Sequence, residues 1–169
     1  MDADAWTNLP NSVQEQRLGV MRCCWGQTSF EEHCRLSAEL GAGYVEDFAG
    51  KLKPDVVDEA AARDALQQAD LPLLLVIAGH LDCSDVNAYC DELAREIERW
   101  QRIGLTTYVT LRGGRGPEFA DFRRALEAAA DLVRRAGLIP VTQNHRGGVV
   151  ESPRELVACV ETGVDLHYD

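Results

Sequence analysis

The sequence predicts an α/β fold in which parallel strands alternate with helices. One unit, an amphipathic helix followed by a glycine and a short β-rich strand, recurs as AELGAGYVE, WQRIGLTTYV, RRAGLIPVT and VETGVDLHY. Strands that are separated by whole helices pair in parallel through right-handed crossovers. The strand segments are also almost continuously apolar, which is typical of strands that are covered on both faces.

Six strands and five helices are expected. The strands are predicted at residues 18–24, 43–48, 73–78, 106–111, 139–143 and 164–168. Helix starts are indicated by capping residues: Ser29 with Glu32, Asp55, Ser84 or Asp85, and Ser152 followed by Pro153. Each helix of the repeated unit ends at a glycine, where a left-handed conformation carries no steric penalty; these are Gly41, Gly104, Gly137 and Gly163. Residues 73–77 of the third strand are expected to be buried nearly throughout, because both faces of a parallel strand are covered.

The chain is expected to form one domain. Its 169 residues lie within the usual size of a single domain. Residues 1–16 lack periodicity and are predicted to be a flexible arm, and residues 17–169 form the α/β domain. The longest apolar run, Leu71–Gly79, is shorter than the ~18–20 residues that a membrane-spanning helix needs, and the acidic N-terminus does not resemble a secretory signal. We therefore predict a cytoplasmic protein without a membrane partner.

Charge and cysteine content exclude further classes of partner. The 17 basic and 28 acidic residues give a net charge of −11, which disfavours binding to a nucleic-acid backbone. The six cysteines include no CxxC pair, and a chain of this size does not need disulfides to fold. We expect reduced and mostly buried thiols.

Two architectures accept this order of elements: an open doubly wound sheet and a (β/α)₈ barrel of the TIM type. The first predicted strand runs into CCWGQTSFEE without a GxGxxG sequence, which argues against a dinucleotide-binding fold. The turn RGGRGP at residues 112–117 follows the fourth strand. Its amides and two arginines fit a phosphate, and its composition equally fits an ordinary turn.

Side chains able to do chemistry follow the predicted strands, at the edge where parallel strands place their sites. They are Trp25, Glu46, Asp47, His80, Arg112, Gln143, Asn144, His145 and Asp169. Imidazoles and carboxylates are divalent-metal ligands and acid–base groups, and an indole ring offers a flat apolar wall to a sugar. The two remaining histidines are predicted elsewhere, with His33 at the surface and His167 in the core.

These segments resemble the xylose-isomerase-like (β/α)₈ barrels, which include sugar isomerases, sugar-phosphate epimerases and family-2 AP endonucleases. The segment RLGVMRCCWGQTSFEEHCRLSAELGAGYVE is similar to the opening of that fold, LIPVTQNHRGG to its fifth strand and VDLHYD to its sixth. The resemblance spans residues 17–169 and implies an incomplete TIM barrel with six of the eight strands.

The resemblance also implies a function and a set of site residues. It implies metal-assisted proton transfer next to a carbonyl in a small sugar or sugar phosphate, with Mn²⁺, Mg²⁺ or Zn²⁺ as the cofactor. Gln143 and Asp169 take the positions of metal ligands, Glu46 and His145 take catalytic positions, and Trp25, His80 and Arg112 take substrate-binding positions. Family-2 AP endonuclease activity needs a basic groove, which the net charge of −11 disfavours.

Two departures from the family pattern bear on activity. Gln143 is an amide where the family has a carboxylate, so it has no negative charge and cannot act as a base. Strands seven and eight of the family, which carry further ligands, have no counterpart in the sequence, and six strands do not close a barrel. Two hypotheses therefore stay open: a sugar isomerase or epimerase, and a catalytically inactive barrel fragment or assembly partner, expected to form a homo-oligomer.

Overall fold

The computed structural model describes residues 18–114, 116–145 and 147–167. The predicted arm at 1–16 and the predicted ligand Asp169 lie outside the described residues. The described strands form one parallel sheet in the order β1-β2-β3-β4-β5-β6. This order confirms the barrel-type prediction, because a doubly wound sheet would place a later strand beside the first one. The strands are β1 (Gly19–Met21), β2 (Tyr44–Phe48), β3 (Leu73–His80), β4 (Leu105–Arg112), β5 (Ile139–Gln143) and β6 (Asp165–His167).

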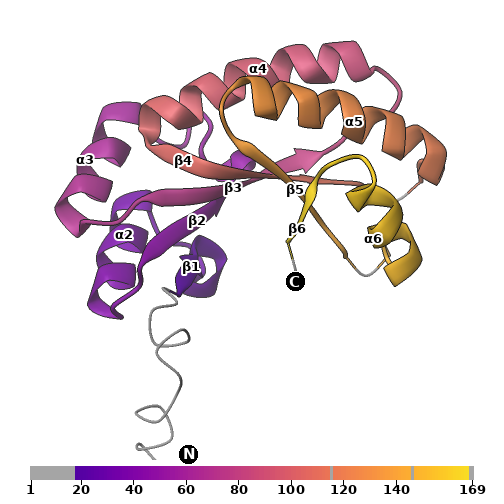
Figure 1. Ribbon diagram of the computed structural model, residues 1–169. Coiled ribbons are helices and arrows are strands. Elements are labelled where there is room, and N and C mark those ends of the chain that lie inside the picture. Colours follow the sequence, from indigo (N-terminus) through magenta and orange to yellow (C-terminus); the bar gives the residue numbers. More distant parts are fainter. Residues whose placement is uncertain (1–17, 115, 146, 168–169) are drawn as a thin grey trace, which may run out of the picture.

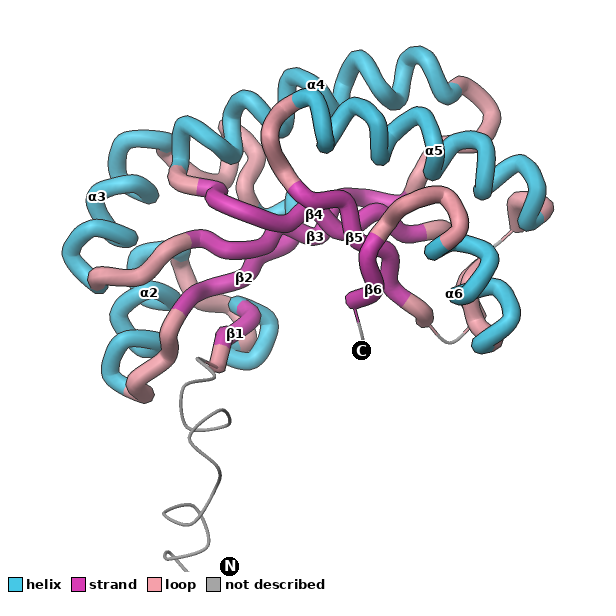
Figure 2. Tube along the Cα trace, in the orientation of Figure 1, coloured by secondary structure: helices cyan, strands magenta, loops and turns pink. Residues whose placement is uncertain are grey.

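The sheet is curved, and the helices lie along its outer side (Figure 1). They are α2 (Phe30–Glu39), α3 (Glu59–Ala69), α4 (Val86–Ile103), α5 (Phe119–Arg135) and α6 (Pro153–Val160), with short 3₁₀ helices η2 (Arg22–Trp25) and η3 (Ala49–Lys51). Figure 2 shows that each helix connects two neighbouring strands. The inner side of the sheet carries no helix in the described part of the chain, so side chains there face the hollow of the partial barrel.

The helix caps follow the predicted chemistry, with one correction. The Ser29 hydroxyl accepts a hydrogen bond from the Glu32 amide, and Ser152 with Glu155 forms a complete capping box. The predicted cap Asp55 is wrong. Asp58 caps α3 instead, because its carboxylate accepts hydrogen bonds from the first free amides of the helix. The predicted glycines Gly41, Gly104, Gly137 and Gly163 all have positive φ.

The first strand is shorter than predicted. It ends at Met21, and the residues predicted to continue it to Cys24 turn into η2. This turn places Arg22 inside the protein and leaves Cys23 and Cys24 exposed. All six cysteines are free, as predicted, but the expectation that most are buried is wrong.

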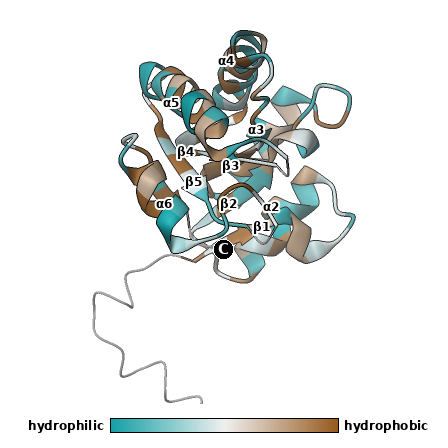
Figure 3. Ribbon diagram, turned by 90° about the vertical axis from the view of Figure 1, so that its right-hand side faces the viewer, coloured by the Kyte–Doolittle hydropathy of each residue, from teal (hydrophilic) through white to brown (hydrophobic). Residues whose placement is uncertain are grey.

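The main core lies between the sheet and the helices. Its buried side chains come from strands, such as Leu73 and Val76, and from helices that include α4 and α5. In Figure 3 both of these helices carry hydrophilic as well as hydrophobic residues. A smaller cluster of Leu75, Ile77 and Val141 lies on the other face of the strands. Leu74 is half-buried and is the exception to the predicted burial of residues 73–77. No helix in the described ranges has the length and apolar character needed to cross a membrane.

Candidate functional site

The carboxyl ends of β3, β4 and β5 bring three predicted site residues to one edge of the sheet. His80 pairs with Arg112 in the register of β3 and β4. Leu111 pairs with Thr142 in the register of β4 and β5, so Arg112 and Gln143 are the next residues on neighbouring strands. Because alternate residues of a strand face opposite sides, Gln143 shares the inner face with Val141. We call His80, Arg112, Gln143 and Asn144 the edge cluster.

The Arg112 side chain crosses the inner side of the sheet. Its guanidinium carbon lies 5.6 Å from the ring centre of Phe48, at the end of β2. This cation–π contact holds the guanidinium over the strand that lies between, β3. The Nε atom of Arg112 is buried and has no hydrogen-bond partner, and no described carboxylate forms an ion pair with this arginine. The charge of Arg112 is therefore available to a ligand.

Gln143 and Asn144 present unpartnered acceptors beside that charge. Gln143 is 5% exposed, and its Oε1 atom has no hydrogen-bond partner. The Oδ1 atom of Asn144 is buried and unpartnered in the same way. Leaving a buried polar atom unpaired costs about 1–3 kcal/mol, so proteins rarely keep such atoms without a reason. Three of the unpartnered atoms thus gather at the ends of two neighbouring strands, β4 and β5, where a ligand can complete their hydrogen bonds.

The loops that follow β4 and β5 pack closely around His80. A Cβ atom added at Gly114 would lie 3.1 Å from the His80 Nδ1 atom, and one added at Gly113 would lie 2.0 Å from a Val149 methyl carbon. The glycines after β4 are therefore required for packing between loops. Partial burial lowers the pKa of His80, and electrostatic interaction with Arg112 and with His145 lowers it further. The interaction with His80 places His145 at the same edge.

Trp25 is held by a histidine that sequence analysis misplaced. The Trp25 Nε1 atom donates a hydrogen bond to His33 Nδ1 at 3.0 Å, so the proton of His33 is on Nε2, which lies 3.3 Å from the Glu46 carbonyl oxygen. His33 is fully buried, and the predicted surface position is wrong. Its side of α2 faces strand β2, and burial lowers the pKa of His33 to about 4. The position of His33 on the apolar side of an amphipathic helix was the sequence signal that could have predicted its burial.

The side chain of Glu46 lies deeper than the edge cluster. It lines a hollow of about 640 Å³ on the inner face, together with residues that include Tyr44, Tyr108 and Asp165. Burial raises the pKa of the Glu46 carboxyl group. In the register of the sheet Glu46 pairs with Leu75, which precedes His80 by five residues or about 16 Å of strand. The structure therefore does not bring Glu46 into the edge cluster.

Asp47, another carboxylate that the sequence places at a strand end, has a structural partner. Its Oδ1 atom accepts hydrogen bonds from Arg22 Nε at 3.2 Å and from the Phe48 amide at 2.8 Å, and its Oδ2 atom lies 2.8 Å from Arg22 Nη2. Arg22 Nη2 also donates to the Lys51 carbonyl oxygen at 2.7 Å. Both charged side chains are almost completely buried, so this pair holds η2 against β2 and η3.

The described residues do not fit a divalent cation. The Oε1 atom of Gln143 is free to ligate, but it is neutral and lies beside the Arg112 strand end, where a positive charge repels a cation. Within the described ranges no three His, Cys, Asp or Glu side chains are close enough together to hold a metal ion. Asp169, the predicted carboxylate ligand, lies outside those ranges. The predicted metal site therefore stays a prediction.

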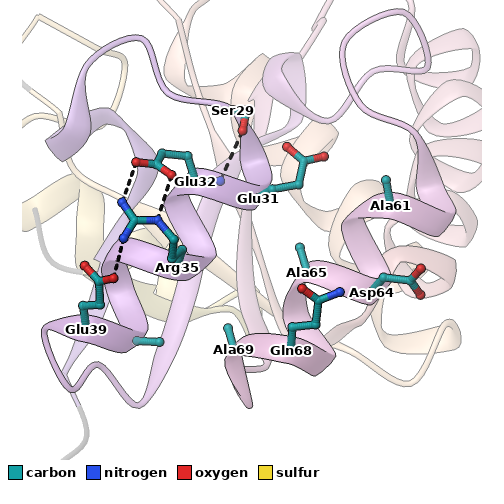
Figure 4. A pocket seen from close by; sticks show the side chains of 11 residues that line it. Ser29, Glu31, Glu32, Arg35, Glu39, Ala61, Asp64, Ala65, Gln68 and Ala69 are labelled. Atoms are coloured by element: carbon teal, nitrogen blue, oxygen red, sulfur yellow. Dashed lines mark hydrogen bonds and ion pairs between the residues drawn. The ribbon is translucent and has the colours of Figure 1, made fainter.

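Another hollow, of about 710 Å³, lies on the outer surface between α2 and α3 (Figure 4). Alanines from both helices line it, and acidic residues surround it. Its arginine, Arg35, is already bound by Glu32 and Glu39 of the same helix. None of the predicted site residues lines this hollow, so it is not the candidate site.

Comparison with known proteins identifies the fold. No family model matches the sequence, and no curated protein matches it. Solved structures do match: D-allulose 3-epimerase from Methylomonas sp. in complex with D-allulose aligns with a TM-score of 0.72 and 19% identity, over 91% of this chain and 63% of that chain. A xylose isomerase domain protein from Alicyclobacillus acidocaldarius aligns with a TM-score of 0.67 and 16% identity, over 90% of this chain and 62% of that one.

An AP endonuclease of family 2 from Brucella melitensis is also similar, with a TM-score of 0.63 and 17% identity over 91% of this chain and 68% of that chain. The chain spans 63% of the length of the Methylomonas protein and 62% of the length of the Alicyclobacillus protein. The fold is therefore that of the xylose-isomerase-like TIM barrels, of which this chain has six parallel strands and five α-helices in its described residues.

Proposed function

We propose that the chain is part of a sugar or sugar-phosphate isomerase or epimerase and that it binds its small-molecule substrate at the edge cluster. The observation that supports this proposal is the set of unpartnered buried atoms at the ends of β4 and β5, Arg112 Nε, Gln143 Oε1 and Asn144 Oδ1. They lie at the edge of the sheet where TIM barrels bind their substrates. Structures with this fold include sugar epimerases.

The binding residues have complementary tasks. Arg112 and His80 face the polar groups of the substrate, and the amide oxygens of Gln143 and Asn144 accept hydrogen bonds from its hydroxyls. Trp25, fixed by His33, offers a ring wall for an apolar sugar face. These contacts orient the sugar and exclude water from it.

The acid–base residues of the proposal are Glu46 and His145. Burial raises the pKa of Glu46, which favours proton exchange nearer neutral pH. In the register of the sheet Glu46 pairs with Leu75, five residues before His80, so its carboxylate lies below the strand ends that carry the edge cluster. We therefore expect this chain to bind sugars without epimerising them at a measurable rate.

Isothermal titration calorimetry of the whole chain with D-allulose, D-fructose and D-fructose 6-phosphate tests the proposal. Binding of at least one sugar, weakened by His80→Gln and by Trp25→Ala, is the expected result. Arg124→Gln is the matched control, because Arg124 is a largely exposed arginine of α5 that pairs only with Asp121. A failure of all three ligands to bind would contradict the proposed function.

A role as an assembly partner is the second candidate. In the described sheet β1 and β6 each pair with one strand only. The apolar side chains Ile139 and Leu166, on the neighbouring strands β5 and β6, are 38% and 42% exposed. Open strand edges and exposed apolar side chains favour association, so we expect a homo-oligomer in light scattering. A well-dispersed monomer at high micromolar concentration would contradict this role.

A further inference from the structure

The edge cluster has a positive local charge in a chain whose net charge is −11. Arg112 forms no ion pair with a described carboxylate, although seven other arginines of the chain do. Gln143, beside it, is neutral where the family pattern has an acid. The side chain of Asp47, the acidic residue at the end of β2, is occupied by Arg22. A ligand at this edge therefore meets an uncompensated positive charge.

The unpartnered atoms define the chemistry of the ligand that completes the cluster. Arg112 Nε is a charged donor and requires an acceptor, for which an oxyanion is the strongest. Gln143 Oε1 and Asn144 Oδ1 are acceptors and require donors, which hydroxyl groups supply. A neutral sugar satisfies the amides but leaves the guanidinium without a counter-charge. A bare oxyanion satisfies the guanidinium but offers the amides few donors.

The sheet leaves room for such a ligand on its inner face. Gly79 lies on β3, between the strands that carry Phe48 and Arg112, and it is exposed. A Cβ atom added at Gly79 would meet no other atom within 4 Å. The register of β3 with β4 shifts between Ile77 and His80, so the strand is irregular at this open position. The Arg112 guanidinium contacts Phe48 of β2, and β3, which lies between β2 and β4, has no side chain at Gly79.

We propose that the edge cluster is a subsite for a hydroxylated anion, a sugar phosphate or a sugar acid, bound directly by Arg112 without a bridging cation. Arg112 neutralises the phosphate or carboxylate group, and Gln143 and Asn144 accept hydrogen bonds from the neighbouring hydroxyls. This inference rests on the proposed function and narrows its substrate class. It also places an anionic group of the ligand beside Gln143, where the family resemblance implies a metal cation.

Calorimetry with matched probes tests the subsite on the whole chain in metal-free buffer. The probes are D-fructose 6-phosphate, D-gluconate, D-fructose and inorganic phosphate. We expect the phosphorylated sugar or the sugar acid to bind at least about tenfold more tightly than D-fructose and than inorganic phosphate, since hydrogen bonds to a charged group strengthen binding by that factor or more. The two charged sugars distinguish a phosphate from a carboxylate as the anionic group.

Two substitutions assign the binding to the cluster. Arg112→Gln removes the charge and is expected to lower the affinity for the anionic sugar to that for D-fructose, whereas Arg124→Gln leaves it unchanged. Gln143→Glu places a negative charge beside Arg112 and is expected to weaken anion binding by at least about tenfold. Circular dichroism of each variant confirms that it is folded before it is titrated.

The outcomes separate the subsite from the proposed function. Equal affinities for D-fructose and the anionic sugars would overturn the subsite and leave the sugar-binding function standing. Binding of inorganic phosphate as tight as that of D-fructose 6-phosphate would support an anion site but overturn the hydroxyl contacts and the sugar function. Anion binding that survives Arg112→Gln, or that requires Mn²⁺, would overturn the subsite as assigned.

Discussion

The β1–β2 side and the β4–β5 side of the sheet differ in how their arginines are paired, since Arg22 has a carboxylate partner and Arg112 has none among the described residues. On the β1–β2 side, the buried guanidinium of Arg22 is held by Asp47 and the Lys51 carbonyl, and His33 is bonded through both ring nitrogens. On the β4–β5 side, Arg112 Nε and Gln143 Oε1 are buried and unpartnered. Both sides present residue types that a sequence marks as functional. A charged side chain that is paired inside the protein has a structural role, whereas one of the same chemistry without a partner is available to a ligand.

The largest expected effect is on the paired side. Asp47→Ala leaves the Arg22 guanidinium buried without its carboxylate, and breaking a buried pair in this way costs about 3–5 kcal/mol. Urea denaturation should show a loss of this size in the free energy of unfolding. Glu39→Ala is the control, because Glu39 pairs with Arg35 at the surface and its loss should cost less than about 1 kcal/mol. Similar losses in both variants would remove the distinction between the two kinds of pair.

The second prediction concerns the dependence of stability on pH. The pKa of His33 is about 4 in the folded chain because of burial, against about 6.5 when unfolded. Between these values the unfolded state binds more protons, so the stabilisation is complete above pH 6.5 and is lost as the pH falls towards 4. The difference amounts to about 3 kcal/mol. Burial raises the pKa of Asp47 to about 6, which acts in the opposite direction over the same pH range, so the His33 contribution is the difference in denaturation midpoint between the wild-type chain and His33→Leu from pH 7.5 to 4.5.

His33→Leu should lose less stability than the wild-type chain as the pH falls, and His80→Gln should lose about as much as the wild-type chain, because His80 is an exposed residue. An unchanged slope in His33→Leu would show that His33 is not the buried titrating group. The same variant frees the indole of Trp25 from its hydrogen bond, so its fluorescence should shift even at neutral pH.

The fold was predictable because its signals are local and repeated. Gly137 ends α5 with a φ of 77°, and β5 begins two residues later at the predicted position. The signals failed where tertiary contacts decide the outcome. Strand β1 ends early because Arg22 turns inward to Asp47, 25 residues away in the chain. The cap of α3 is Asp58 rather than Asp55, and sequence alone offered both aspartates.

The sequence predicted which residues lie at the strand ends, but it did not predict how far each of them lies from the edge of the sheet. His80, Arg112 and Gln143 follow their strands and meet at one edge as expected. Glu46 was expected to join them, but the stagger between strands in a tilted sheet places it beside Leu75. The contact of Arg112 with Phe48 also joins strands that are not neighbours, so no spacing in the sequence indicates it.

A third prediction sharpens the comparison on the unpartnered side. Gln143→Met replaces a buried amide with an apolar side chain of similar shape and removes an unsatisfied acceptor. We expect the free energy of unfolding to rise by about 1 kcal/mol, while binding of D-fructose 6-phosphate weakens. A site kept for a ligand gains stability when its ligand-binding group is removed, whereas Asp47→Ala does the reverse. Destabilisation of Gln143→Met by more than about 2 kcal/mol would instead indicate a structural amide.

The smallest expected effect is the binding of a metal ion to the chain. Calorimetry with Mn²⁺ should show at most weak binding, and Asp169→Asn should not change it. A hard cation requires about six oxygen-rich ligands, commonly with more than one carboxylate, and the edge cluster supplies a neutral amide beside a guanidinium. Gln143→Glu should raise the Mn²⁺ affinity relative to wild type, because a carboxylate offsets the charge of Arg112. Micromolar Mn²⁺ affinity in the wild-type chain, abolished by Asp169→Asn, would establish a metal site in place of the anion subsite.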